Sequence, residues 1–246
     1  MVNKEIISSK DNRKVKELRK LHQRKYRKKT GQFLIEGEHL IEEAVRFKQE
    51  IHLIVLTESA VPSFDVETFE CMYVSDSVMK VLSSLETPPG MLAVVSYIPA
   101  NDNGNRVLAL DGIQDPGNLG TLIRTADAFG FSRLILSEDT TDPFSDKVLR
   151  SAQGSTFHLN IQSGSIVDAV NAFDGLTIGT SLEGSVFLEE STPESHVMVV
   201  LGNEGQGVSS AVLNAVDQKV KIQMTGFSES LNVAVAGSII MHHFKA

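Results

Sequence analysis

The chain has 246 residues, of which 41% are hydrophobic and 22% charged, a composition typical of a globular protein with one large or two modest domains. Its one cysteine, Cys71, excludes an internal disulfide and a cysteine-based zinc site. No apolar run is long enough to cross a membrane, and the first ten residues lack the apolar core of a signal peptide. We therefore expect a cytoplasmic protein without a membrane segment.

Charge is distributed unevenly along the chain. The net charge is −8, but residues 1–30 contain 12 Lys or Arg and 3 Asp or Glu, so they carry about +9 and the remainder about −17. Such asymmetry is typical of a phosphate-binding segment attached to an acidic body, which keeps nucleic acid among the expected partners.

The basic residues lie in a segment with helical periodicity, residues 12–29. Val15, Leu18, Leu21 and Tyr26 mark one side of this predicted amphipathic helix. A solvated charged face would also explain the run, but its density favours contact with an RNA backbone. We predict a basic helical arm over residues 1–30, whose cations are Lys14, Arg19, Lys20, Arg24, Lys25, Arg27, Lys28 and Lys29.

A small α/β unit is expected over residues 31–97. Its apolar runs predict strands at residues 51–56, 72–74 and 91–97 and helices at residues 38–47 and 76–85, with the run F-L-I-E-G (33–37) just before the first helix. Residues 98–106, rich in Pro, Gly, Asn and Asp, are the best candidate for a linker.

From residue 107 to the end, strand and helix patterns alternate. Strands are predicted at residues 107–110, 133–136, 176–178, 197–201 and 220–224, and helices at residues 119–129, 143–153, 165–173, 208–215 and 231–244. Alternation of this kind predicts βαβ units and a mainly parallel sheet flanked by helices. General rules of chain topology favour an unknotted, Rossmann-like arrangement.

Three polar turns follow predicted strands. In the first, Asn118 is a plausible N-cap, and Arg124 projects from the far side of the helix, where an arginine is ordinarily just solvated. The second is glycine-rich, but its spacing does not fit a dinucleotide loop, and Glu204 would repel a pyrophosphate. In the third, Ser230 or Asn232 could cap the last helix. Such turns suit a small polar ligand, although ordinary α/β proteins also contain them.

These turns resemble, in order, three signature motifs of one family. They read L-D-G-I-Q-D-P-G-N-L-G-T-L-I-R-T-A-D-A-F-G (residues 110–130), V-V-L-G-N-E-G-Q-G-V-S (199–209) and I-Q-M-T-G-F-S-E-S-L-N-V-A-V-A (222–236). The chain is therefore identified as a member of the SpoU, or TrmH-like, branch of the SPOUT RNA methyltransferases. Gln223 stands where the family usually has proline, which puts the stiffness of that turn in question.

The resemblance implies a C-terminal trefoil knot in the domain of residues 107–246, and an L30e-like RNA-binding domain at residues 31–97. It also implies a homodimer that transfers methyl groups from S-adenosylmethionine to a ribose 2′-hydroxyl of rRNA or tRNA. The implied catalytic residues are Asn118, Arg124, Glu204, Ser230 and Asn232. The implied cofactor-binding residues are Thr180, Leu201, Gly202, Glu204, Gly205, Ile222, Met224 and Leu231.

Other candidates carry less specific signals. Lys147, Arg150 and Ser151 could contact RNA phosphate, with a solvated helix face as the alternative. His242 and His243 are adjacent on a helix and point apart, so we expect no metal site. Two rival functions are a non-catalytic RNA-binding protein that retains the fold and a nucleotide-binding oxidoreductase, which lacks its fingerprint here.

Overall fold

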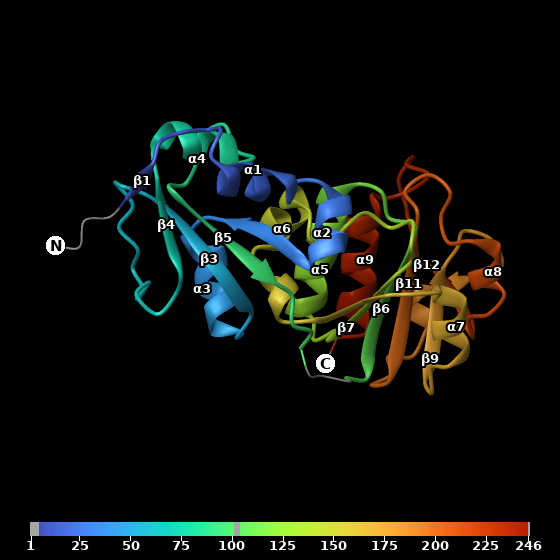
Figure 1. Ribbon diagram of the computed structural model, residues 1–246. Helices are drawn as coiled ribbons and strands as arrows, with labels where there is room; N and C mark the ends of the chain where they lie inside the picture. The colour runs from blue at the N-terminus through green and yellow to red at the C-terminus, as the bar shows by residue number, and fades with distance from the viewer. Residues whose placement is uncertain (1–4, 101–103, 246) are drawn as a thin grey trace. The chain divides into compact units, whose positions relative to one another are not determined.

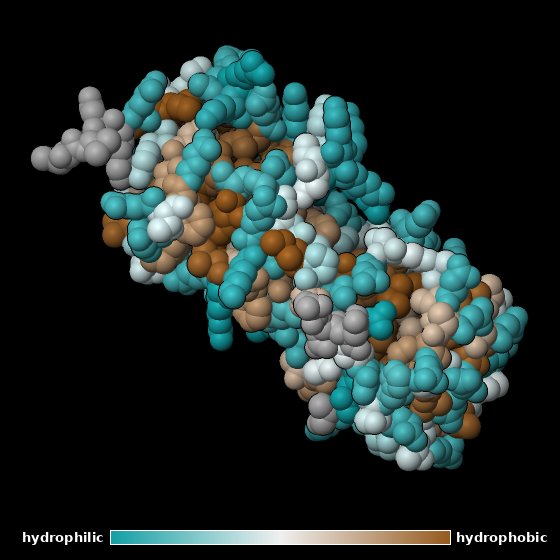
Figure 2. Space-filling model, turned by 60° about the horizontal axis from the view of Figure 1, so that its bottom comes forward, coloured by the Kyte–Doolittle hydropathy of each residue, from teal (hydrophilic) through white to brown (hydrophobic). Residues whose placement is uncertain are grey.

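The computed structural model describes residues 5–100 and 104–245 and divides into two compact units (Figure 1). The first unit contains residues up to Ile98 together with Phe144–Phe157, and the second contains Pro99–Pro143 and the chain from His158 onward. On the face drawn in Figure 2, hydrophilic side chains surround scattered apolar patches. No helix in the described part of the chain has the length and apolar character that crossing a bilayer requires.

The second unit is built on a seven-stranded sheet in which every neighbouring pair is parallel. The strand order is β10-β12-β9-β11-β6-β7-β8. The strands are β6 (Arg106–Asp111), β7 (Arg133–Leu136), β8 (Asn160–Ser163), β9 (Leu176–Thr180), β10 (Val186–Phe187), β11 (Val197–Gly202) and β12 (Gln218–Lys221). The predicted α/β fold with a mainly parallel sheet is confirmed. The trefoil knot stays a prediction.

Helices lie on both faces of this sheet because strand residues alternate in direction. Val107, Ala109, Met198 and Val200 share a buried cluster with residues of α7 and α8, and Leu201 contacts α9. The helices of this unit are α5 (Pro116–Ala128), α7 (Ile166–Asn171), α8 (Ser210–Leu213) and α9 (Val233–His243), with a 3-10 turn, η2, at Leu188–Glu190.

Close packing of α9 depends on a glycine. A Cβ added at Gly237 would lie 2.5 Å from Leu201 Cδ1 and 2.6 Å from Leu122 Cδ2. Both leucines are buried, so neither can move away without disturbing the core. The small residues of the last predicted helix therefore allow α9 to pack closely against α5 and β11.

The first unit has a mixed five-stranded sheet in the order β1-β4-β3-β5-β2. Leu34 joins the apolar cluster on one side of it, whereas Phe33 and Ile35 join the other, as the alternation of a strand requires. Its strands are β1 (Ile6–Ile7), β2 (Gln32–Glu36), β3 (Glu50–Thr57), β4 (Cys71–Val74) and β5 (Met91–Ser96). Its helices are α1 (Arg13–Lys20), α2 (Arg24–Thr30), α3 (Glu38–Arg46), α4 (Asp76–Leu82) and α6 (Asp146–Ala152), with a 3-10 turn, η1, at Ser155–Phe157.

The prediction of one basic helix over residues 12–29 is wrong, because the segment forms α1 and α2 with a break at residues 21–23. Val15, Leu18 and Leu21 are buried in the core of the unit, so α1 is packed in place and is not a separate arm. Arg27, expected among the exposed cations, is buried and donates from Nη1 to the Leu21 carbonyl at 2.7 Å. This hydrogen bond provides a donor for the Leu21 carbonyl, which lies at the break between α1 and α2.

The segment Phe144–Phe157 packs with the first unit although its neighbours in sequence belong to the second. Phe144 stacks on Phe33 with ring centroids 4.8 Å apart, and Leu149 and Phe157 join the same apolar cluster. Residues 107 to 246 were expected to form one continuous domain. Instead, α6 and η1 belong to the first unit.

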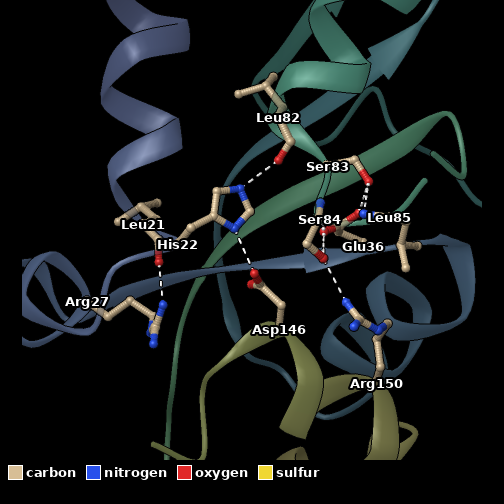
Figure 3. Close-up of polar contacts among 10 residues, drawn as sticks. All are labelled: Leu21, His22, Arg27, Glu36, Leu82, Ser83, Ser84, Leu85, Asp146 and Arg150. Carbon is tan, nitrogen blue, oxygen red and sulfur yellow. Dashed lines mark hydrogen bonds and ion pairs between the residues drawn. The ribbon is translucent and has the colours of Figure 1, made fainter. Parts of the chain in front are cut away.

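Polar contacts also hold α6 (Figure 3). Arg150 Nη1 donates to Ser84 Oγ at 2.7 Å, and Ser84 Oγ donates to Glu36 at 2.7 Å. His22 Nδ1 lies 2.7 Å from Asp146 Oδ2, and His22 Nε2 lies 2.8 Å from the Leu82 carbonyl. Because both partners accept, the doubly protonated ring fits this position best. The hydrogen bond to Asp146 raises the pKa of His22, against an opposing effect of burial.

This raised pKa predicts a pH-dependent stability. The stabilisation is fully present below the unfolded-state pKa of about 6.5 and is lost as the pH rises through the higher folded-state pKa. We expect His22→Gln to lower the free energy of unfolding by about 2 kcal/mol at about pH 5.5, the size of a charged hydrogen bond. Urea titrations at a series of pH values measure the difference, which should shrink in alkaline buffer.

His39→Gln is the control, because His39 is an exposed histidine of the same unit. A destabilisation by His22→Gln that stays constant across the pH range would contradict the prediction.

Candidate active site

A cavity of about 450 Å³ opens at the carboxyl ends of β9, β11 and β12 in the second unit. Ligands in parallel α/β sheets bind at this edge. Most of the predicted cofactor-binding residues line it, together with Ser230; they are Thr180, Gly202, Glu204, Gly205, Ile222, Met224 and Leu231. Leu201 does not line the cavity, because its side chain is buried against the α9 glycine.

The end of β12 differs from its prediction in a way that matters here. The strand was expected to run to residue 224, but it ends at Lys221. Ile222 and Met224 therefore leave the sheet and contribute to the cavity wall.

The loop after β11 folds tightly back on itself. Asn203 and Gly207 exchange backbone hydrogen bonds of 3.0 and 2.9 Å. A Cβ added at Gly202 would lie 2.0 Å from both the Gly207 carbonyl carbon and the Val208 nitrogen, so only glycine fits. Asn203 was not among the predicted site residues. Its Oδ1 accepts from the Gly205 and Gln206 amides, and its Nδ2 donates to the Gly112 carbonyl. A short polar side chain inside a glycine-rich turn was the available signal.

Hydrogen bonds join the three motifs in one chain. Glu204 Oε1 accepts from Asn118 Nδ2 at 3.0 Å, and Asn118 Oδ1 accepts from Asn232 Nδ2 at 2.9 Å. Glu204 also accepts from the backbone amides of Gln114 and Asp115. We call Glu204, Asn118 and Asn232 the motif-linking chain.

Helix capping orients the side chains of the motif-linking chain. Of the two candidate caps, Asn232 is the one that caps α9. Its Oδ1 accepts from the Ala234 and Val235 amides, so its Nδ2 is left to face Asn118. The prediction that Asn118 caps α5 is wrong, because Asp115 is the cap and accepts from the Asn118 amide at 2.9 Å. The Asn118 side chain is thereby available to both of its partners.

Glu204 remains ionised in this arrangement. Partial burial raises the pKa of its carboxyl, but the hydrogen bonds from Asn118, Asp115 and Gln114 together outweigh that effect and leave the pKa below its ordinary value. A carboxylate at the rim disfavours a phosphate-bearing ligand in the cavity, as the sequence predicted.

Arg124 lies apart from the cavity. Its side chain is exposed on α5, and it is not among the lining residues. The structure thus brings Asn118, Glu204 and Asn232 into contact, places Ser230 on the cavity wall and leaves Arg124 facing solvent. Within the described residues, no cluster of three or more His, Cys, Asp or Glu side chains could hold a metal ion.

Comparison with known proteins agrees with this geometry. Residues 105–242 match the SpoU rRNA Methylase family, and residues 12–93 match the MRM3-like substrate binding domain. The chain is 41% identical to the 23S rRNA (guanosine(2553)-2′-O)-methyltransferase RlmP of Bacillus subtilis (strain 168), over 97% of this chain and 98% of that protein.

Solved structures are similar over nearly the whole chain. The AdoMet-bound rRNA methyltransferase from Sinorhizobium meliloti superposes with a TM-score of 0.88 at 29% identity, covering 98% of this chain and 97% of that one. The SpoU methyltransferase AviRb from Streptomyces viridochromogenes, in complex with AdoMet, gives 0.84 at 25% identity, covering 95% and 97%.

Fold, cavity and comparisons together define an S-adenosylmethionine-dependent RNA 2′-O-ribose methyltransferase. The chain belongs to the SpoU rRNA methylase family. The predicted family, activity and cofactor are confirmed, and RNA is a partner. The likeness of residues 31–97 to ribosomal protein L30e stays a prediction.

The cavity fits the cofactor by its own chemistry. Its volume lies within the range of about 300–1,000 Å³ that small-molecule sites occupy. Ile222, Met224 and Leu231 give the cavity an apolar wall of the kind that suits a flat adenine ring.

The tight loop predicts the effect of one added methyl group. We expect Gly202→Ala to weaken binding of S-adenosylmethionine at least about tenfold, because the Cβ clashes with backbone and the loop must shift. Isothermal titration calorimetry measures the affinity. Gly164→Ala is the control, because a Cβ there meets nothing within 4 Å. Equal affinity in the two variants would refute the steric argument.

Proposed function

We propose that the chain methylates the ribose 2′-hydroxyl of a guanosine in 23S rRNA. The observation that carries this proposal is the 41% identity to RlmP over nearly the full length of both chains. The similarity includes the part of the chain that matches a substrate-binding domain, where choice of RNA would reside.

The cavity would hold the methyl donor in one orientation. The donor supplies an electrophilic methyl group, so the protein's task is to position the hydroxyl and assist loss of its proton. Thr180, Gly202 and Gly205 would contact the donor from the ends of β9 and β11, opposite the apolar wall of Ile222, Met224 and Leu231. Leu201 would act indirectly, by packing against Gly237 of α9.

The motif-linking chain would keep the three loops in register. Glu204 accepts hydrogen bonds from the first motif, and Asn232 connects that motif to the cap of α9. Ser230, two residues before that cap and on the cavity wall, would hydrogen-bond the incoming ribose hydroxyl.

Arg124 would act on the RNA. A guanidinium stays protonated at any working pH, so it serves as a clamp for phosphate and a stabiliser of the developing alkoxide. Its exposed place on α5 suits a partner that arrives from solvent. The non-catalytic alternative is less well supported, because the hydrogen-bonded Asn118, Glu204 and Asn232 are all in place.

The proposal is tested by mixing the protein, labelled S-adenosylmethionine and 23S rRNA, and then identifying labelled nucleosides after digestion. We expect 2′-O-methylguanosine with the unmodified chain. Arg124→Ala should lower kcat by about a hundredfold or more without changing donor affinity, because Arg124 does not line the cavity.

Arg133→Ala is the matched control, since Arg133 begins β7 at the opposite edge of the sheet. If the label from S-adenosylmethionine appears in tRNA and not in rRNA, the proposed substrate is wrong. Donor binding without label in any RNA class would favour the non-catalytic alternative.

The basic face of α2 is a proposed contact for the RNA backbone. Lys25, Lys28 and Lys29 are exposed, and their spacing of three and four residues places them on neighbouring positions of the helix surface. Because α1 contributes Val15, Leu18 and Leu21 to the core, deleting residues 1–30 would damage the fold and test nothing. Substitution of the lysines is the appropriate experiment.

We expect Lys25→Ala, Lys28→Ala and Lys29→Ala together to weaken RNA binding and to reduce the log–log salt slope by about 2, at about 0.7–0.9 per phosphate contact. Filter binding at several salt concentrations measures both. Lys48→Ala with Lys80→Ala, two exposed lysines of the same unit, is the control. An unchanged slope in the triple variant would exclude α2 from the RNA contact.

A homodimer and a cytoplasmic location are also proposed. Val235 and Ile239, four residues apart on α9, are 50% and 40% exposed and form an apolar stripe that a second copy could cover. A monomer in sedimentation velocity at micromolar concentration would contradict the dimer. The location follows from rRNA as the substrate.

A further inference from the structure

Phe227 is the most exposed large apolar side chain among the described residues. Its relative exposure is 108%, compared with 67% for Leu182 and 37% for Phe187 in the same unit. A phenyl ring gains nothing from water, and no apolar neighbour covers it. The whole ring is therefore available for contact with a partner.

The chain around Phe227 belongs to the cavity wall. Met224 and Ser230, which line the cavity, stand on either side of it in sequence. Ser230 is three positions after Phe227, so their Cα atoms lie within about 11 Å of each other. Phe227 is therefore carried by the loop that supplies Met224 and Ser230 to the cavity wall, close in sequence and in space to Ser230.

The loop that carries the ring is held at both ends. It begins where β12 ends at Lys221 and finishes at Asn232, which caps α9 and bonds to Asn118. Ser228 Oγ donates to the Ser230 carbonyl at 2.8 Å and closes the turn beside the ring. A Cβ added at Gly226 would meet nothing within 4 Å, so the space next to Phe227 is open. An anchored loop beside open space can present a flat ring to a ligand.

We propose that Phe227 stacks on a nucleobase of the substrate RNA and so positions the adjoining ribose at the cavity. This inference rests on RNA as the substrate of the proposed function. Proteins read unpaired RNA by stacking its bases on aromatic side chains. A phenyl ring offers no hydrogen bond or charge to a phosphate, so a base is the part of a nucleotide that suits it.

The stacking role predicts how substitutions at this position affect turnover. Phe227→Ala should lower kcat/KM for RNA about tenfold to a hundredfold, the range that loss of one base–aromatic stack produces. Phe227→Leu should fall nearly as far, because it keeps the apolar surface but loses the flat ring. Phe227→Tyr should stay close to the unmodified chain. Donor affinity, measured by calorimetry, should be the same in all three, because Phe227 does not line the cavity.

A fluorescence measurement detects the stack directly. The chain has no tryptophan, so Phe227→Trp introduces a lone indole at this position. Addition of a 23S rRNA fragment that the protein methylates should quench its emission. Ala172→Trp is the control, because Ala172 is exposed and lies between α7 and the start of β9, at the opposite edge of the sheet from the cavity.

The outcomes separate this inference from the proposed function. Slow turnover by Phe227→Ala, rescue by Phe227→Tyr and quenching confined to Phe227→Trp support the stack. Turnover of Phe227→Ala equal to that of the unmodified chain, with the two tryptophan variants responding alike to RNA, overturns the stack and leaves the methyltransferase intact. Failure of the unmodified chain to methylate any RNA overturns the proposed function.

Discussion

The rest of the site depends on the hydrogen bonds from Glu204 to Asn118 and from Asn118 to Asn232. Asn118, Glu204 and Asn232 follow three different strands, β6, β11 and β12, so these hydrogen bonds join three separate segments of the chain. An ionised carboxylate accepts three donors from the first motif, and this is why its pKa lies below the ordinary value. Because Asn232 also caps α9, the same side chain ties the N-terminus of that helix to the first motif.

Two glycines allow close packing at positions where a Cβ atom would clash. Gly202 allows the loop after β11 to turn back on itself at the cavity rim, and Gly237 lets α9 settle against Leu122 and Leu201. Close packing of α9 sets where its N-terminus and Asn232 lie. The cavity is thus bounded by elements that the core holds rigidly, as a site that must align two substrates requires.

The first unit includes a segment from later in the chain, Phe144–Phe157. Phe144, Leu149 and Phe157 complete one of its apolar clusters, and Asp146 meets His22 at the break between α1 and α2. That break also turns Arg27 inward and leaves Lys25, Lys28 and Lys29 outside. The two short helices therefore carry one buried cation, Arg27, and three exposed ones.

Local sequence determined the alternation of strands and helices, the parallel sheet and the three polar turns, of which the second and third line the cavity, because strand periodicity, caps and glycine turns act over a few residues. The family resemblance added the cofactor and the reaction. Only the tertiary structure decided that Asp115 caps α5 and frees Asn118, that Arg27 is buried, and that α6 joins the first unit. Each of these depends on a partner distant in sequence or on competition between neighbouring side chains for one backbone amide, and no local pattern carries that information.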